Sequence, residues 1–160
     1  MVEINKFILA DSGFWFALLN SRDEYYEQAV QIEQEIENCK LLFPWPVLYE
    51  VVNSKFVKSQ HQVVEFERIL KRTSSILIHD EKYREACVES VFEWARGKKR
   101  AISLVDSVIR EILSDEDIRI DGFITFNLRD FSDVITKRKT PLIFCDSKNK
   151  ISRTRASSGN

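Results

Sequence analysis

The sequence predicts an α/β fold in which helices flank a mostly parallel central sheet. Short apolar runs, each about as long as a buried strand, alternate with longer segments whose apolar residues recur at helical spacing. The chain has 160 residues, of which 44% are hydrophobic and 31% charged, as in ordinary globular proteins. This length is sufficient to bury a sizeable core, so we expect one main domain.

The N-terminal part of the chain begins with a predicted strand and two predicted helices. Residues 7–10 form a short apolar run that suits a buried parallel strand, and Asp11 or Ser12 can cap the helix that follows. Asp23 is the candidate N-cap of a second helix, whose apolar side begins at Tyr26. Residues 40–43 then resemble a second strand.

The middle of the chain continues this alternation. Pro46 stands where the first turn of a helix tolerates proline, and a further helix is expected over residues 63–70. Residues 75–80 contain a third strand with its exit, and residues 82–96 are helical in composition. Gly97 and the cations after it form a predicted basic turn.

The C-terminal part supplies one more helix and two more strands. Ser103 opens a predicted helix over residues 104–113, and residues 122–125 and 142–144 are short apolar strands. We place the main domain at residues 1–147. Residues 148–160 are polar, small and basic, and we expect this tail to be disordered.

Charge and cysteine content exclude several classes of protein. The net charge of −1 argues against a strongly basic body that binds duplexes nonspecifically. With three cysteines, no C-x-x-C pair and two histidines, neither a disulfide framework nor a zinc site is favoured. No apolar stretch approaches the ~20 residues that span a bilayer, and no signal peptide is evident, so we expect a cytoplasmic protein without membrane contact.

Carboxylates interrupt apolar runs at three positions. Asp11 follows the first strand, Glu50 lies within V-L-Y-E-V-V, and Asp106 lies within A-I-S-L-V-D-S-V-I. A fourth acid, Asp130, follows the strand at 122–125. Because buried carboxylates need a partner, and α/β sheets bind ligands at the carboxyl ends of strands, these acids suit a hard cation such as Mg²⁺ or Mn²⁺.

Each acid also has a purely structural interpretation. Asp11 could act as a plain helix cap, and Asp106 stands three residues after Ser103 in an acidic form of the capping box. Glu50 could lie on a helix edge that touches solvent, and Asp130 could be an ordinary loop acid. The four acids together favour a metal site more strongly than any one of them.

The order of these motifs resembles the PIN domain, a nuclease fold of VapC-type toxins from toxin–antitoxin pairs and of other RNA-processing proteins. The resemblance rests on Asp11-Ser12, Glu50, S-L-V-D at 103–106 and T-F-N-L-R-D-F at 125–131, and it covers about residues 6 to 145. The segment from Asp23 also resembles a D-x-x-H-x-x-A pattern of that family, with Tyr26 in place of the histidine.

The resemblance implies a three-layer fold and a metal-dependent ribonuclease that uses Mg²⁺ or Mn²⁺. Its catalytic metal ligands would be Asp11, Glu50, Asp106 and Asp130, where Asp130 replaces an acid that many members have at the position of Asn127. Four residues would support these ligands with hydroxyl or amide groups: Ser12, Ser103, Thr125 and Asn127. The implied partners are an RNA substrate, an antitoxin protein and a second copy of the chain.

Candidate contacts to RNA outside the cut site are cations and tryptophans. The cations that could meet phosphates are Lys98, Lys99, Arg100 and Arg129, although a solvated turn is the simpler interpretation of the first three. Three tryptophans could stack on bases, but each lies in apolar company and suits a core or an interface: Trp15, Trp45 and Trp94.

Two other functions remain open at this stage. One is a catalytically inactive PIN-like domain that binds RNA or protein, which metal affinity would distinguish from a nuclease. The other is a phospho-acceptor receiver domain, which normally has adjacent acids near its first strand. Asp11 has no acidic neighbour in the sequence, which disfavours the receiver.

Overall fold

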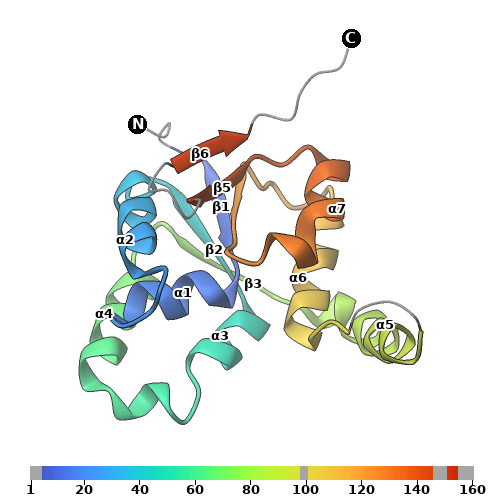
Figure 1. Ribbon diagram of the computed structural model, residues 1–160, viewed down its shortest axis with the longest axis horizontal. Helices are drawn as coiled ribbons and strands as arrows, with labels where there is room; N and C mark the ends of the chain where they lie inside the picture. The colour runs from blue at the N-terminus through green and yellow to red at the C-terminus, as the bar shows by residue number, and fades with distance from the viewer. Residues whose placement is uncertain (1–4, 98–100, 146–150, 155–160) are drawn as a thin grey trace.

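The central feature of the fold is a six-stranded sheet with the strand order β3-β2-β1-β4-β5-β6 (Figure 1). The computed structural model describes residues 5–97, 101–145 and 151–154. Strands β1 to β5 are mutually parallel, and β6 pairs antiparallel with β5 at the edge. The strands are β1 Phe7–Ala10, β2 Lys40–Pro44, β3 Ser75–Ile78, β4 Gly122–Ile124, β5 Leu142–Cys145 and β6 Ile151–Thr154. The predicted α/β fold with a mostly parallel sheet is confirmed.

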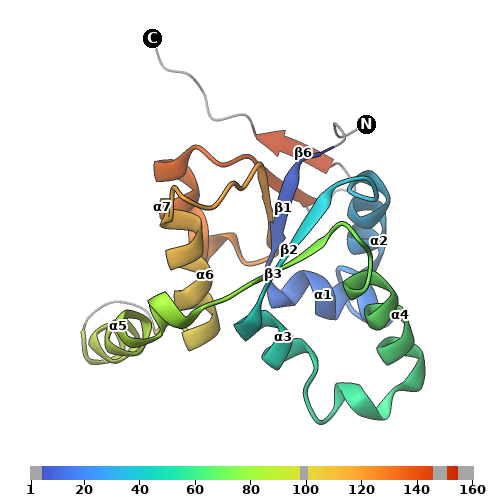
Figure 2. The same ribbon diagram turned by 180° about the vertical axis from the view of Figure 1, so that it is seen from behind.

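Helices cover both faces of this sheet and make three layers. Figures 1 and 2 show α1, α2 and α4 on one side, and α6 and α7 on the other with α5 beside them. The helices are α1 Ser12–Leu19, α2 Tyr26–Glu35, α3 Trp45–Val51, α4 Gln60–Leu70, α5 Arg84–Arg96, α6 Leu104–Ser114 and α7 Leu128–Arg138. Two short 3₁₀ turns, η1 Phe56–Lys58 and η2 Glu81–Tyr83, precede α4 and α5.

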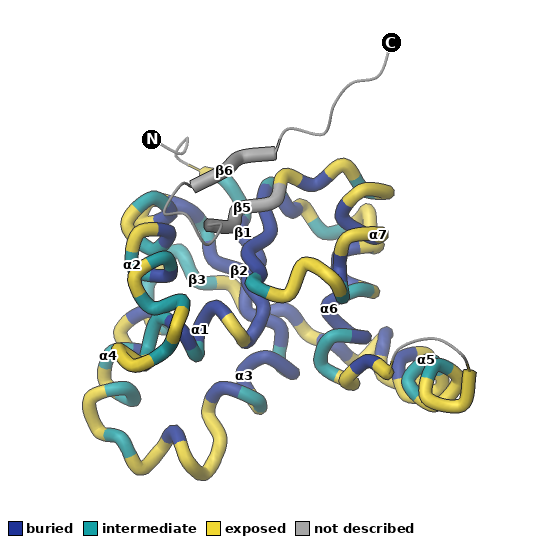
Figure 3. The backbone as a smooth tube through the Cα atoms, in the orientation of Figure 1, coloured by how far each residue is buried: buried dark blue, intermediate teal, exposed yellow. Residues whose placement is uncertain are grey.

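The core lies between the sheet and these two helical layers (Figure 3). Strands β1 and β4 are buried on both faces, which explains why they are continuous apolar runs rather than alternating ones. On the α1 side, the Trp15 ring is fully buried and stacks on Phe43 with centroids 4.8 Å apart. On the other side, Phe123 packs edge-to-face against Phe131 at 5.1 Å. Of the three tryptophans, Trp15 is therefore a core residue.

The register of the sheet places the residues after β1 and β4 side by side. Ala10 is paired with Ile124, and the backbone N–H of Asp11 donates to the carbonyl of Ile124 at 3.1 Å. Asp11 and Thr125 consequently meet at the carboxyl edge of the sheet, where open α/β folds bind their ligands.

Helix α7 was not expected from the sequence. The sequence predicts Asp130 in a polar segment after the strand at 122–125, whereas Asp130 lies in the first turn of α7. Phe131, Val134 and Ile135 are the buried residues of this helix, and their spacing matches one helical face. The polar residues at its start obscured this face.

Helix α2 begins later than predicted. It starts at Tyr26 and has Tyr25 as its N-cap residue, without a side-chain cap. The Asp23 carboxylate accepts a hydrogen bond from the N–H of Tyr25 at 2.9 Å, and its carbonyl accepts one from Tyr26. Asp23 thus stabilises the turn before the helix, because aspartate side chains favour such local turns.

Part of the tail predicted to be disordered forms a strand. Residues 151–154 form β6, which pairs antiparallel with β5. Leu142 lies opposite Thr154 at one end of this pairing, and Cys145 lies opposite Ile151 at the other. Backbone pairing against an exposed edge strand does not require an apolar segment, so polar composition does not exclude a strand here. Residues 148–150 and 155–160 lie outside the described part of the chain.

Two further expectations concern membranes and thiols. Within the described residues, no helix has both the length and the apolar character needed to cross a bilayer. Cys39 and Cys87 are buried and free, as expected for structural thiols, and burial raises the pKa of both.

Candidate active site

Asp11 is the N-cap of helix α1 and lies almost completely buried, with 5% of its surface exposed. One carboxylate oxygen accepts a hydrogen bond from the N–H of Phe14 at 3.0 Å, and the other accepts one from the Thr125 hydroxyl at 2.5 Å. A carbon atom added at Gly13 would lie 3.3 Å from this carboxylate, so the glycine leaves room for it. The capping interpretation of Asp11 is therefore correct, and the carboxylate is also fixed in one orientation.

The electrostatic environment of Asp11 disfavours its ionised form. Its pKa is raised from 3.8 to about 6, chiefly because burial removes the charged carboxylate from water. The hydrogen bonds from Thr125 and Phe14 oppose this rise, whereas the negative charges of Asp106 and Glu50 add to it. Three of the four predicted acids are consequently close enough to interact.

Glu50 and Asp106 approach Asp11 because helices α3 and α6 pack against each other. Asp106 lies in the first turn of α6, and its backbone N–H donates to the Ser103 hydroxyl at 3.0 Å. This hydrogen bond is the one that the S-L-V-D pattern predicted for the cap of that helix.

The expectation that these acids are buried is confirmed for Asp11 alone. Glu50 and Asp106 are only partly buried, unlike Asp11. Helix α3 ends one residue after Glu50, and Tyr49 and Val52 on either side of this end are exposed. The solvent-touching helix edge considered for Glu50 is therefore what the structure shows.

Asp130 connects to Asp11 through a chain of hydrogen bonds. The backbone N–H of Asn127 donates to the Thr125 hydroxyl at 2.9 Å, and that hydroxyl donates to Asp11. The side-chain amide of Asn127 donates to the Asp130 carboxylate at 2.5 Å. Asn127 thereby orients Asp130, and Thr125 orients Asp11.

Arg110 holds the start of helix α7, a role that the sequence did not indicate. Its guanidinium donates to the Asp130 carbonyl at 2.6 Å and to both carboxylate oxygens of Asp133 at 2.7 and 2.6 Å. It also lies over the Trp94 ring, 5.2 Å from the centroid. Its side chain is only 15% exposed, and it joins α6 to α7.

The donor atoms of the site are carboxylate oxygens, which are the ligands that Mg²⁺ and Mn²⁺ prefer. Within the described residues, no three acidic, histidine or cysteine side chains are already arranged as a metal-binding group. Two observations still fit a cation: the negative charges that act on Asp11, and the buried Ser12 hydroxyl, which has no hydrogen-bond partner in the described structure.

Of the predicted RNA-binding cations, only Arg129 belongs to the part of the chain that the structure describes. Lys98, Lys99 and Arg100 lie outside the described residues. Arg129 is exposed in the first turn of α7, next to Asp130.

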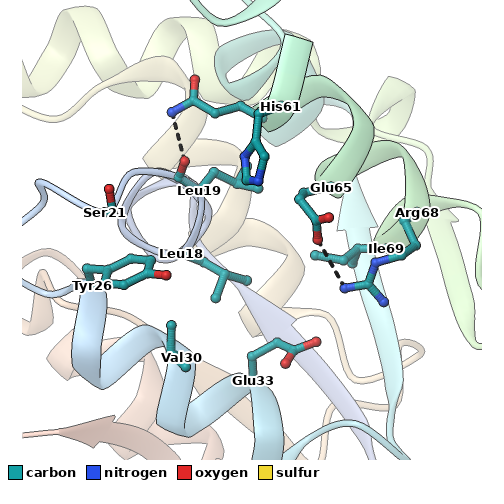
Figure 4. A pocket seen from close by; sticks show the side chains of 11 residues that line it. Leu18, Leu19, Ser21, Tyr26, Val30, Glu33, His61, Glu65, Arg68 and Ile69 are labelled. Atoms are coloured by element: carbon teal, nitrogen blue, oxygen red, sulfur yellow. Dashed lines mark hydrogen bonds and ion pairs between the residues drawn. The ribbon is translucent and has the colours of Figure 1, made fainter. Parts of the chain in front are cut away.

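A cavity of about 370 Å³ lies between α1, α2 and α4, away from these acids (Figure 4). Glu33 and Glu65 line it, but each is paired with an arginine, Glu33 with Arg72 at 3.0 Å and Glu65 with Arg68 at 3.3 Å. A second cleft, of about 520 Å³, opens between α3, α5 and α6 and includes Glu50. Of these two cavities, the second is the one lined by a predicted site acid, Glu50.

The fold is similar to that of two solved VapC structures. VapC20 of Mycobacterium tuberculosis, described as a toxin that cleaves the sarcin–ricin loop, matches with a TM-score of 0.58 and 23% identity over 79% of this chain and 93% of that chain. VapBC2 of Rickettsia felis, bound to a DNA fragment from its promoter, matches with a TM-score of 0.51 and 14% identity over 79% and 92%. No protein-family model matches the sequence, and neither does any curated protein. The PIN-like fold expected from the sequence is confirmed by these similarities.

Proposed function

We propose that this protein is a divalent-metal-dependent endoribonuclease of the VapC type, which hydrolyses phosphodiester bonds in RNA. The observation that supports this most directly is the buried Asp11 carboxylate at the carboxyl edge of a PIN-like sheet, where the negative charges of Glu50 and Asp106 act on it. The three acids come from separate segments of the chain, and the negative charges of Glu50 and Asp106 both act on Asp11.

In this proposal the acids hold Mg²⁺ or Mn²⁺. Asp11, Asp106 and Asp130 are the proposed direct ligands, and Glu50 would hold the same ion through water or a second one. When bound, the ion would lower the pKa of a water molecule and neutralise charge on the phosphate.

The other residues of the site fix these ligands. Thr125 and the N–H of Phe14 hold the two oxygens of Asp11, and Asn127 holds Asp130. Ser103 fixes the first turn of α6, which carries Asp106. The Ser12 hydroxyl, which has no partner within the described residues, is available to a bound water.

The biological setting is a second part of the proposal. By analogy with the two VapC structures, we infer that the protein is the toxin of a toxin–antitoxin pair, with an antitoxin protein as partner and a homodimer as assembly. The alternative is a PIN-like domain that binds RNA or protein without cleaving it, because Asn127 stands where many such domains have an acid.

Calorimetric titration with Mn²⁺ tests the metal site. We expect the wild-type protein to bind Mn²⁺ and Asp106→Asn to lose most of this affinity, because the variant removes one charged ligand. Glu111→Gln is the matched control, since it removes one negative charge from an exposed position on the same helix. It should bind Mn²⁺ like the wild type.

Cleavage of RNA tests the activity. Single-stranded RNA and a hairpin containing the sarcin–ricin loop are suitable substrates, incubated with Mn²⁺ or with chelator. We expect Asp106→Asn to lose at least a hundredfold in rate and Glu111→Gln to retain the wild-type rate. Equal Mn²⁺ binding by both variants, with or without RNA, would instead support the non-catalytic domain.

A further inference from the structure

The cleft beside Glu50 combines an apolar floor with an exposed aromatic ring. Its floor is formed by Pro46, Val88, Leu104 and Val108, from helices α3, α5 and α6. Tyr49 also lines the cleft, although 70% of its surface is exposed, the largest fraction among the exposed large hydrophobic residues described. A ring so placed contributes little to the core and leaves most of its surface for a ligand.

Tyr49 belongs to a short row of aromatic side chains. Its ring centroid lies 5.9 Å from that of Trp45, which lies 6.3 Å from the ring of His79. Trp45 is partly buried at the start of α3 and thus supports Tyr49 from one side. The direction of the Tyr49 ring is therefore restricted even though the residue is exposed.

One wall of the cleft carries a fixed cation. The Arg84 guanidinium donates to both carboxylate oxygens of Asp80, at 3.0 and 2.8 Å, and Asp80 is buried. About half of the Arg84 side chain remains exposed, at 52%. Asp80 fixes the guanidinium, Glu81 lies 3.9 Å from it, and Arg84 lines the cleft.

We propose that this cleft receives one unpaired nucleobase of the RNA substrate, which stacks on Tyr49 next to the phosphate held at the acidic site. This inference rests on the proposed function, because it assigns a base-binding subsite to the same nuclease. Glu50 belongs both to the acidic site and to the cleft. In this proposal, a nucleoside attached to a phosphate bound beside Glu50 would lie next to the cleft.

The side chains of the cleft suit an unstacked nucleobase. Aromatic side chains bind bases of any sequence through their faces, and an arginine can contact a base edge or the neighbouring phosphate. A base within a duplex is already stacked on its neighbours, so the cleft selects loops, bulges and single strands. Glu50 and Arg84 both line the cleft, and the positive charge of Arg84 beside a predicted site acid favours a nucleotide over an apolar protein segment.

Fluorescence of 2-aminopurine tests the stacking, because this base loses emission when it stacks on an aromatic ring. The probes are short single-stranded RNAs in which 2-aminopurine replaces one base in turn, bound to the full-length protein in Ca²⁺ with RNA integrity checked on a gel. We expect quenching at one position with the wild type, and none at that position with Tyr49→Ala. The affinity for RNA should fall about tenfold to a hundredfold in Tyr49→Ala.

Matched variants separate stacking from other effects. Tyr49→Phe and Tyr49→Trp should restore the quenching, since both keep an aromatic face. Phe92→Ala removes another exposed aromatic residue, on α5 and outside the residues that line the cleft, and should behave like the wild type. Mn²⁺ affinity should be the same in the wild type and in Tyr49→Ala.

The possible results distinguish this inference from the proposed function. Quenching that persists in Tyr49→Ala, or no quenching at any position with the wild type, would overturn the base-binding subsite while leaving the metal site intact. A Tyr49→Ala variant that binds RNA normally but self-associates more weakly would assign the cleft to a protein instead. Failure of the wild type to bind Mn²⁺ would count against the nuclease and not against the stacking.

Discussion

Replacing Asp11 by asparagine is expected to stabilise the metal-free protein while abolishing cleavage. Asparagine is isosteric with aspartate and is as good an N-cap, so its side-chain oxygen can still accept the hydrogen bonds from Phe14 or Thr125. The substitution mainly removes a carboxylate that must ionise while buried near Asp106 and Glu50.

The magnitude follows from the pKa of Asp11, which is 3.8 ordinarily and about 6 in the folded protein. Because the folded state binds the proton more tightly than the unfolded state, this group lowers the stability as the pH rises from 3.8 to 6. The two values differ by roughly two pH units, so the full loss is about 3 kcal/mol above the folded pKa. Asp11→Asn should recover an amount of this order at neutral pH.

Urea unfolding followed by circular dichroism, in the presence of a chelator, measures this difference. We expect Asp11→Asn to be more stable than the wild type by about 2–3 kcal/mol at neutral pH, and by less than about 1 kcal/mol near pH 4, where the carboxyl is protonated in the folded state. Added Mn²⁺ should stabilise the wild type and not the variant.

The reasoning would be refuted by a variant that is equally or less stable at neutral pH under chelating conditions. That result would mean that ionisation of the Asp11 carboxyl costs no more in the folded protein than in the unfolded chain. A stability difference that does not change between neutral pH and pH 4 would show that packing, rather than ionisation, is responsible.

Three further predictions concern the scaffold of the site, each measured as a free energy of unfolding. Ser103→Ala should cost about 1 kcal/mol, because it removes the cap of α6, whereas Ser103→Asn should cost little. Arg110→Lys should destabilise the protein by about 1–3 kcal/mol, because lysine cannot contact two carboxylate oxygens and a carbonyl together. Its control is Arg68→Lys, which alters an exposed ion pair and should change the stability by less than about 0.5 kcal/mol. Lys139→Gly should stabilise by about 1 kcal/mol, because Lys139 ends α7 at a φ of 59°, where glycine has no steric penalty. Unchanged stability of Ser103→Ala or Arg110→Lys, or a loss in Lys139→Gly, would contradict the corresponding argument.

The sequence by itself determined the alternation of strands and helices, because this depends on local properties. A parallel strand buried on both faces is a continuous apolar run, as in β1. The caps at Asp11 and Ser103 were also predictable, since each acts on backbone groups within three residues. Local patterns failed where polar residues masked a helical face, as in α7, and where backbone pairing alone made a strand, as in β6.

Only the tertiary structure decided which acids meet and how they are held. The neighbours β1 and β4 are far apart in the chain, and their pairing brings the Thr125 hydroxyl to Asp11. Helices α3 and α6 pack against each other, the charges of Glu50 and Asp106 both act on Asp11, and residues of α3, α5 and α6 line the cleft that exposes Tyr49. Side chains from distant segments meet only when strand order and helix packing are fixed, and neither depends on the periodicity of any single segment. The sequence therefore identified the four candidate acids, while the fold determined their burial, their partners and the surface on which a substrate would lie.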